Sequence, residues 1–293
     1  MTATVQRPLA PGGVKRRRTL RAVLGMGAVL AATLAPGSPA AAVTGGQPDN
    51  GRHPQVAFLM AELPDGITFC TGTLISPTVI LTAAHCTSFW DDLGMSEVQV
   101  SFDDRITAAG TFYTSTEWHT HPGYSDSAWP FTTDIGVVVL SEAVGFAPAT
   151  LPDEGLLSTL IPENGAANNQ KFMDVGYGQT GVDTGGGPPQ ASFPLERRMS
   201  VQTYHPGRNN LVGVIHGMGP ELLMLKANPS SRHGSGCGGD SGGPIFRDGT
   251  FTIVAIHTGG YRLGFDGQLC GRLSSLNHRV DTPEVLDWLA QFL

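Results

Sequence analysis

Short runs of β-forming residues, separated by turn residues, recur along the chain from residue 56 to residue 256. The 293 residues include 39 Gly and 21 Pro without a collagen-like repeat, so tight turns are frequent. Strands at this spacing are typical of an all-β sandwich or a pair of barrels, and they argue against a helix bundle. The expected strands form a first set at residues 56–60, 73–76, 79–82, 98–102, 110–116 and 135–140, and a second set at residues 172–175, 198–204, 221–226, 244–247 and 250–256.

One helix is expected close to the C-terminus. Asp281 or Thr282 can cap its N-terminal end, and Pro283 suits its first turn. Apolar residues follow at helical spacing up to Phe292, which gives the helix one apolar face. We expect this face to pack onto the second set of strands.

Residues 1–42 have the three parts of a secretory signal peptide. A basic cluster at residues 15–21 precedes an apolar run at residues 22–35, and residues 40–42 are all alanine. The apolar run is too short to span a bilayer, which requires roughly 20 residues. We therefore predict cleavage after Ala42 and secretion of a mature, soluble chain that begins at Val43.

The mature part of the chain is strongly acidic. Residues 43–293 carry 12 Lys and Arg against 25 Asp and Glu, a balance of −13. Such a surface repels phosphate backbones and anionic lipid. We therefore expect neither a nucleic-acid nor a membrane partner.

All four cysteines, Cys70, Cys86, Cys237 and Cys270, lie in the mature part. An oxidising compartment lets disulfides persist, and four cysteines allow three pairings. Zinc is the alternative, but the spacings contain no C-x-x-C pair. His119 and His121 form an H-x-H pattern that could bind a metal on a strand, yet residues 118–122 look like a loop. We expect no metal site and no cofactor.

Three short motifs stand out together: LTAAHC at residues 81–86, TDIGV at residues 133–137 and GCGGDSGGP at residues 236–244. With DVGYG at residues 174–178, they resemble the His, Asp, Ser and Gly-Trp-Gly segments of the chymotrypsin-like serine proteases of bacterial type, in that family's order. The resemblance implies two antiparallel six-stranded β-barrels followed by a C-terminal helix. The first barrel, at residues 43–155, carries His85 and Asp134, and the second, at residues 156–293, carries Ser241.

The chemistry of these residues fits that resemblance. A serine hydroxyl becomes a good nucleophile when a base takes its proton and a third group orients the base. His85 and Asp134 suit these roles beside Ser241, and the backbone N–H groups of Gly239 and Ser241 suit an oxyanion hole. The expected function is secreted serine endopeptidase, with protein or peptide substrates, protein inhibitors as possible further partners and a monomeric state.

Two other functions fit parts of the sequence. Residues 239–243 satisfy the G-x-S-x-G motif of α/β-hydrolases such as esterases, but that fold requires the acid and the histidine to follow the serine. A catalytically silent relative that only binds peptides is the other alternative, and the three intact motifs argue against it.

The family resemblance also implies the disulfide pairing and the mechanism of activation. It pairs Cys70 with Cys86, and Cys237 with Cys270. In active relatives the amine of the mature N-terminus pairs with the Asp that precedes the catalytic Ser. Val43, the first residue after the predicted cleavage site, and Asp240 have those positions here.

The specificity pocket differs from that of trypsin-like relatives. Ser235 stands at the pocket base, where those relatives have an Asp, so preference for Arg or Lys is not expected. The wall segment at residues 255–260, which ends at Gly260, is similar to that of glutamate-specific bacterial members. There His257 would meet a substrate carboxylate and Thr258 would support Asp134. We expect a large apolar or an acidic residue on the acyl side of the scissile bond, the P1 position.

Overall fold

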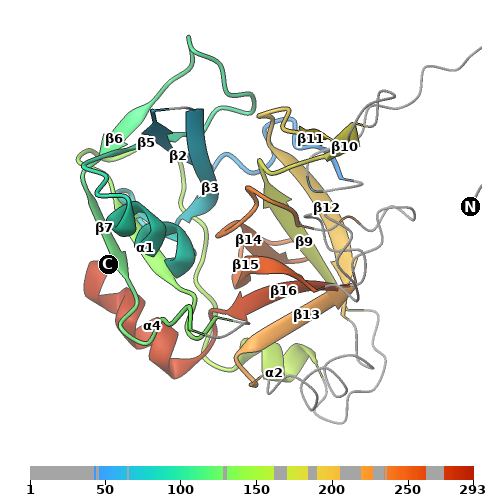
Figure 1. Cartoon of the computed structure of the whole chain (residues 1–293). Coiled ribbons are helices and arrows are strands. Elements are labelled where there is room, and N and C mark those ends of the chain that lie inside the picture. Colours follow the sequence, from blue (N-terminus) through green and yellow to red (C-terminus); the bar gives the residue numbers. More distant parts are fainter. Residues whose placement is uncertain are drawn as a thin grey trace, which may run out of the picture. The chain divides into compact units, whose positions relative to one another are not determined.

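The computed structural model describes Val43, the first residue of the predicted mature chain, and most of the residues after it (Figure 1). The predicted signal peptide lies outside the described residues. The described residues are 43, 46–64, 66–127, 131–161, 170–183, 190–204, 219–226, 234, 236–261 and 274–293.

The first sheet is antiparallel and has the strand order β6-β5-β2-β3-β4-β8-β7. Its two end strands are consecutive in the sequence and are separated only by Thr116, so one bent segment supplies both ends and closes the sheet into a barrel of six segments. The strands are β2 (Val56–Leu63), β3 (Gly66–Leu74), β4 (Val79–Thr82), β5 (Val98–Ser101), β6 (Tyr113–Ser115), β7 (Glu117–Thr120) and β8 (Gly136–Val139).

The second sheet is also antiparallel, with the order β1-β12-β9-β14-β15-β16-β13. A bridge between Tyr204 and Leu225 joins its β12 side to β13, so six strands close into a barrel and β1 adds to β12 as a seventh. These strands are β1 (Gln47–Pro48), β9 (Lys171–Gly176), β12 (Arg198–Thr203), β13 (Leu222–Lys226), β14 (Pro244–Arg247), β15 (Ile253–Tyr261) and β16 (Ser274–Arg279); a separate ribbon pairs β10 (Gly181–Asp183) with β11 (Gln190–Ser192). The predicted all-β fold with two barrels is confirmed.

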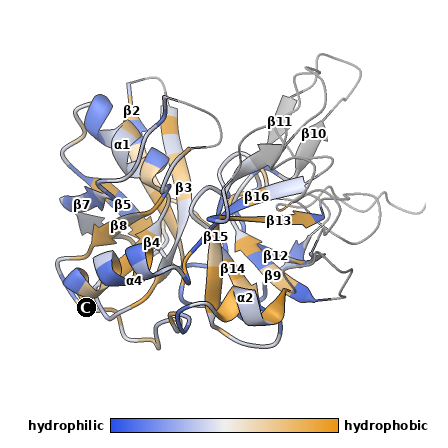
Figure 2. Cartoon of the chain, turned by 90° about the horizontal axis from the view of Figure 1, so that it is seen from below, coloured by the Kyte–Doolittle hydropathy of each residue, from blue (hydrophilic) through white to orange (hydrophobic). Residues whose placement is uncertain are grey.

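β-Branched residues explain why the central strands form where they do. β4 reads VILT and β8 reads GVVV, and the two pair with each other in the interior. Branched side chains pack well on a pleated surface and disfavour helix. Figure 2 shows hydrophobic segments in strands such as β13 and β14, whereas β7 is hydrophilic.

The C-terminal helix α4 (Pro283–Leu289) begins after Thr282, as predicted, but its expected packing partner was wrong. The ring of Trp288 lies 4.9 Å from that of His121, and Phe292 of the following turn η1 (Ala290–Phe292) lies 5.0 Å from His119 of β7. The helix therefore covers the first barrel, beside β7 (Figure 1). An amphipathic pattern identifies the buried face of a helix but not the surface that buries it.

Within the described residues there are two further helices, α1 (Ala84–Asp92) and α2 (Leu156–Leu160). The sequence did not predict either one. Among the described residues, no helix is both long and apolar enough to cross a bilayer.

Candidate active site

Helix α1 and the segment before β8 bring His85 and Asp134 together. His85 lies in the first turn of α1, and its Nδ1 is 2.9 Å from Oδ2 of Asp134. The backbone N–H of His85 donates to the other carboxylate oxygen at 2.8 Å. Because the carboxylate accepts both bonds, the imidazole is held with Nδ1 protonated and Nε2 available as a base.

Burial and hydrogen bonding act in opposite directions on Asp134, which is fully buried. Burial alone raises the pKa of this carboxyl, but the charge and hydrogen bonds of His85 outweigh it and leave the pKa below its ordinary value. Asp134 is therefore ionised at neutral pH. The carboxylate can stabilise a positive charge on His85 when the base takes up a proton.

Ser241 lies in a turn that requires glycine on both sides. Gly239 and Gly242 have φ angles of 93° and 79°. A Cβ on Gly239 would lie 2.3 Å from the ring of Phe69, and one on Gly242 would lie 2.5 Å from the carbonyl oxygen of Thr71. Only glycine fits both the backbone conformation and the space. The turn is therefore held in close contact with β3.

Hydrogen bonds fix this turn between the two barrels. The N–H of Thr71 in β3 donates to the carbonyl oxygen of Ser241 at 2.8 Å. The Thr71 hydroxyl donates to the carbonyl oxygen of Gly239 at 2.9 Å. On the other side, the N–H of Gly242 donates to the carbonyl oxygen of His257 at 2.7 Å. The serine from the second barrel is thus held against the barrel that carries the histidine.

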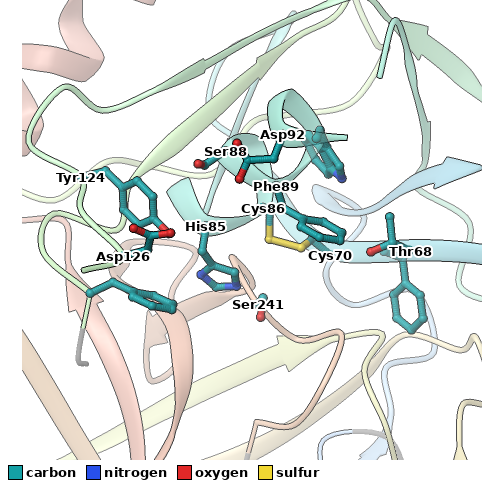
Figure 3. Close-up of a pocket in the computed structure, with 13 residues that line it drawn as sticks. Thr68, Cys70, His85, Cys86, Ser88, Phe89, Asp92, Tyr124, Asp126 and Ser241 are labelled. Atoms are coloured by element: carbon teal, nitrogen blue, oxygen red, sulfur yellow. A yellow bond between two sulfur atoms is a disulfide. The ribbon is translucent and has the colours of Figure 1, made fainter. Parts of the chain in front are cut away.

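His85 and Ser241 line one open pocket of about 500 Å³. Figure 3 shows the imidazole of His85 directed toward Ser241, with Tyr124 on one side and the disulfide of Cys70 on the other. The His85 side chain is 22% exposed, so a bound molecule can reach it. The three residues that the sequence predicted as catalytic are therefore gathered at one place.

A disulfide lies directly beside this pocket. Cys70 of β3 is joined to Cys86 of α1, across a sequence separation of 16 residues. These two sulfurs and His85 are close enough to hold a metal ion, but sulfur in a disulfide is no thiolate ligand. Cys237 is disulfide-bonded too, while Cys270, its predicted partner, lies outside the described residues.

Replacing both Cys70 and Cys86 by Ser is expected to lower the free energy of unfolding by about 3 kcal/mol, because a loop of this length loses its constraint in the unfolded chain. Denaturant titration of the oxidised protein and the double variant measures the difference. The double variant of the half-buried Ser125 and the exposed Ser127, both changed to Ala, is the control, because the two hydroxyls bond to each other at the surface. Equal stability of the disulfide variant and the wild type would contradict this prediction.

Asp240, next to the serine, is completely buried. One carboxylate oxygen accepts the N–H of Gly178 at 2.8 Å and the other accepts the N–H of Cys237 at 2.8 Å. A Cβ on Gly176 or Gly178 would lie within 2.5 Å of the carboxylate, so the DVGYG motif has glycines where the carboxylate needs room. Val43 is also fully buried, with a φ angle of 47°.

The predicted pocket wall is only partly described. His257 is buried, and a Cβ on Gly236 would lie 2.2 Å from its ring, so the imidazole packs directly on that backbone. Gly260 pairs with Ser275 in β15 and β16, and Ser235 lies outside the described residues.

Thr258 does not support Asp134 as the sequence suggested. Its hydroxyl is buried and has no hydrogen-bond partner among the described residues. The charge of Asp134 acts on a different residue, His278, whose pKa it raises against the lowering effect of burial. Burial is the larger effect and lowers the pKa of His278 to about 4. His278 therefore lies close enough to sense the carboxylate but is neutral at neutral pH.

Sequence reasoning missed a second buried His–Asp pair, formed by His53 and Asp49. Asp49 also pairs with Arg197 at 3.0 Å, and Arg197 donates to the carbonyl oxygen of Phe102 and to the Tyr177 hydroxyl. Burial raises the pKa of Asp49, but His53 and Arg197 lower it to about 2 overall. This cluster joins the segment after Val43 to both barrels, and polar residues in loops gave no pattern that predicts it.

Comparisons with known proteins agree with this geometry. A family model described as Trypsin matches residues 43–269. A trypsin of Saccharopolyspora erythraea is 29% identical over 206 residues, which cover 69% of this chain and 81% of that protein. Brachyurin of Leptuca pugilator is 30% identical over 214 residues, which cover 71% and 82%.

A solved structure, that of HL collagenase, has a similar fold. It superimposes with a TM-score of 0.60 at 19% sequence identity, over 83% of this chain and 94% of that one. At this identity the likeness concerns the fold alone.

Proposed function

Because this chain belongs to the trypsin family of serine proteases, we propose that it is a secreted endopeptidase that hydrolyses peptide bonds through an acyl-enzyme on Ser241. His85 acts as the general base and Asp134 orients it. The observation that supports this assignment best is the partly buried hydrogen bond from His85 to Asp134 beside a pocket that His85 shares with Ser241.

In the first half of the reaction, the Ser241 oxygen attacks the carbonyl carbon of the substrate as Nε2 of His85 takes the hydroxyl proton. The carbonyl oxygen becomes an oxyanion, which the N–H groups of Gly239 and Ser241 stabilise by roughly 3 kcal/mol per donor. His85 then gives the proton to the leaving amine as the C–N bond breaks. The acyl group is left on Ser241.

In the second half, a water molecule takes the place of the leaving amine. His85 accepts one proton from it as its oxygen attacks the acyl carbon, and then returns this proton to Ser241 as the ester bond breaks. The acid product leaves and the enzyme is regenerated. Asp134 stabilises the imidazolium in both halves and itself stays ionised.

Labelling with an organophosphonate tests this function. We expect one phosphonyl group per chain, located on Ser241 by mass spectrometry, and turnover of a peptide library by the unlabelled protein. Ser88→Ala is the matched control, because Ser88 lines the same pocket and its loss is expected to leave labelling unchanged. Absence of labelling indicates a binding protein, and turnover of esters without peptides indicates an esterase-like hydrolase.

We further propose the finer features that the family resemblance implies. The substrates are proteins or peptides, protein inhibitors can occupy the same site, and the secreted form is a monomer that starts at Val43. Cys237 and Cys270 form the second disulfide. At the P1 position we propose a large apolar or an acidic side chain, because Ser235 supplies no carboxylate at the pocket base.

The His257→Val variant is expected to reduce cleavage after Glu far more than cleavage after Phe or Leu, because only a carboxylate gains from an imidazole in the pocket wall. His257 also packs on Gly236, and loss of that packing contact should affect both kinds of substrate equally. Values of kcat/KM for a matched peptide series measure the ratio. If both substrates respond alike, His257 only fills space.

A further inference from the structure

A continuous chain of buried polar side chains crosses the interior of the second barrel, starting at His257. Nδ1 of His257 lies 3.4 Å from Oδ1 of Asn277, a long hydrogen bond, and the Asn277 amide donates to the Ser275 hydroxyl at 3.1 Å. The Ser275 hydroxyl donates to Oε1 of Gln202 at 2.8 Å, and the Gln202 amide donates to Asp174 at 2.6 Å. All five side chains are buried.

Every bond in this chain donates in the same direction, away from His257 and toward Asp174. The two amide oxygens carry no hydrogen, so His257 and Ser275 must be the donors to them. Further bonds from the Asn277 amide to the carbonyl oxygens of Leu223 and Ser275 fix which way that amide faces. Hydrogen bonds aligned head to tail polarise one another, so a negative charge at Asp174 favours a positive charge at His257.

The two ends of the chain are both ionisable and both unfavourable when charged alone. Burial lowers the pKa of His257 to about 4, and the charge of His85 adds to this effect, whereas the hydrogen bond to Asn277 and the charge of Asp134 oppose it. Burial and the neighbouring carboxylate of Asp240 raise the pKa of Asp174 well above its ordinary value, against hydrogen bonds from Gln202 and Gly236. Burial therefore favours the neutral form of both groups, the unprotonated imidazole of His257 and the protonated carboxyl of Asp174.

We propose that Asp174 is a positioning residue for the specificity pocket. Through this hydrogen-bond chain, Asp174 lets His257 become positively charged when a substrate carboxylate binds. This inference rests on the proposed endopeptidase function and narrows its P1 preference to acidic side chains. When the carboxylate binds, Nε2 of His257 takes up a proton from water and Asp174 gives up its proton to water; the aligned hydrogen bonds couple the two charges and do not carry the proton. The number of protons on the enzyme does not change, so binding needs no acid solution.

The Asp174→Asn variant removes this compensating loss of a proton while keeping an oxygen that accepts the Gln202 amide. Binding of a Glu side chain then adds one net proton to the enzyme, because no carboxyl gives one up when His257 is protonated. We expect the kcat/KM ratio between two peptides that differ only in Glu or Gln at P1 to be constant from about pH 6 to 8 in the wild type. In the variant the ratio should fall about tenfold per pH unit over the same range.

Ser275→Ala breaks the chain in the middle and leaves both ends in place, so it should weaken the Glu preference as Asp174→Asn does. The double variant should lose no more than either single variant, since the two act through one chain. Ser200→Ala is the matched control, because Ser200 is buried and pairs with Asp174 across the sheet but is not part of the chain. It should leave both substrates unchanged.

Several outcomes would overturn the proposal. Equal losses of kcat/KM for the Glu and Gln peptides in the Asp174 variant indicate a purely structural role. A wild type that cleaves after Phe but not after Glu excludes the acidic preference and leaves the endopeptidase function intact. Failure of phosphonate labelling would instead contradict the proposed endopeptidase function. Histidine-selective ¹⁵N NMR tests the chain without any substrate: His257 should carry its proton on Nδ1 at neutral pH, and the opposite tautomer contradicts the direction of the chain.

Discussion

Replacing Ser241 by Ala, His85 by Ala or Asp134 by Asn is expected to abolish nearly all peptide hydrolysis without unfolding the protein. Loss of the serine or the histidine should lower kcat by about 10⁶-fold, and Asp134→Asn by about 10⁴-fold, because without the carboxylate His85 no longer keeps the productive tautomer. Initial rates with a peptide substrate at saturating concentration measure the effect, and near-ultraviolet circular dichroism checks the fold.

Combining the substitutions distinguishes a catalytic unit from three independent contributions. His85 takes the proton of Ser241, and Asp134 stabilises the imidazolium that forms, so the three residues act as one unit. A variant that lacks all three side chains should therefore be about as slow as the serine variant. Losses that multiply, or a serine variant that keeps a tenth of the activity, would contradict the assignment. Ser88→Ala again serves as the control within the same pocket.

The sequence predicted the fold, and it predicted that His85, Asp134 and Ser241 lie together, because the signals for both are local. Alternating and β-branched runs identify strands such as β4 and β8 by composition alone. The glycines on either side of Ser241 are required by backbone conformation and close contacts, so a short motif is enough to identify the turn. The same holds for the helix that begins after Thr282.

The features that the sequence did not predict depend on contacts between distant segments. β16 reads SSLNHR, which resembles a loop, yet five of its six residues are buried. Its polar side chains are stable there because partners on β12 and β13, such as Gln202 and the Leu223 carbonyl, satisfy them. No pattern within one strand predicts those partners, so Asp174 and the chain that leads to it were missed.

The second large effect is expected at the N-terminus of the mature chain. In the full chain the nitrogen of Val43 is part of a peptide bond, and burial raises the pKa of Asp240 to about 7, although two backbone N–H groups favour its ionised form. A free amine at Val43 that pairs with Asp240 would compensate the buried charge. Without that amine, the ionised carboxylate costs several kcal/mol, enough to displace the turn that carries Gly239.

Protein that begins at Val43 is therefore expected to be active at once. Protein with one extra alanine at its N-terminus should be folded but slower by a factor of about 100 or more, because it loses an oxyanion-hole donor. N-terminal sequencing of the active secreted enzyme, with kcat/KM for both forms, measures this. Full activity of a form that starts at Ala41 or Ala42 would exclude the mechanism. Ala added after the C-terminal Leu293, which is exposed, is the control for an added residue.

The same pairing predicts that the stability of the two forms depends differently on pH. A carboxyl whose pKa is higher in the folded than in the unfolded chain holds its proton more tightly when folded, so its contribution is complete below the unfolded value of 3.8 and is lost as the pH rises to about 7. The extended form should therefore lose stability across this range. In the form that starts at Val43, the positive amine lowers the pKa of Asp240 and removes that loss. Thermal unfolding of both forms between pH 4 and 7 distinguishes them, and Asp240→Asn in the extended form should abolish the pH-dependent loss because Asn carries no charge.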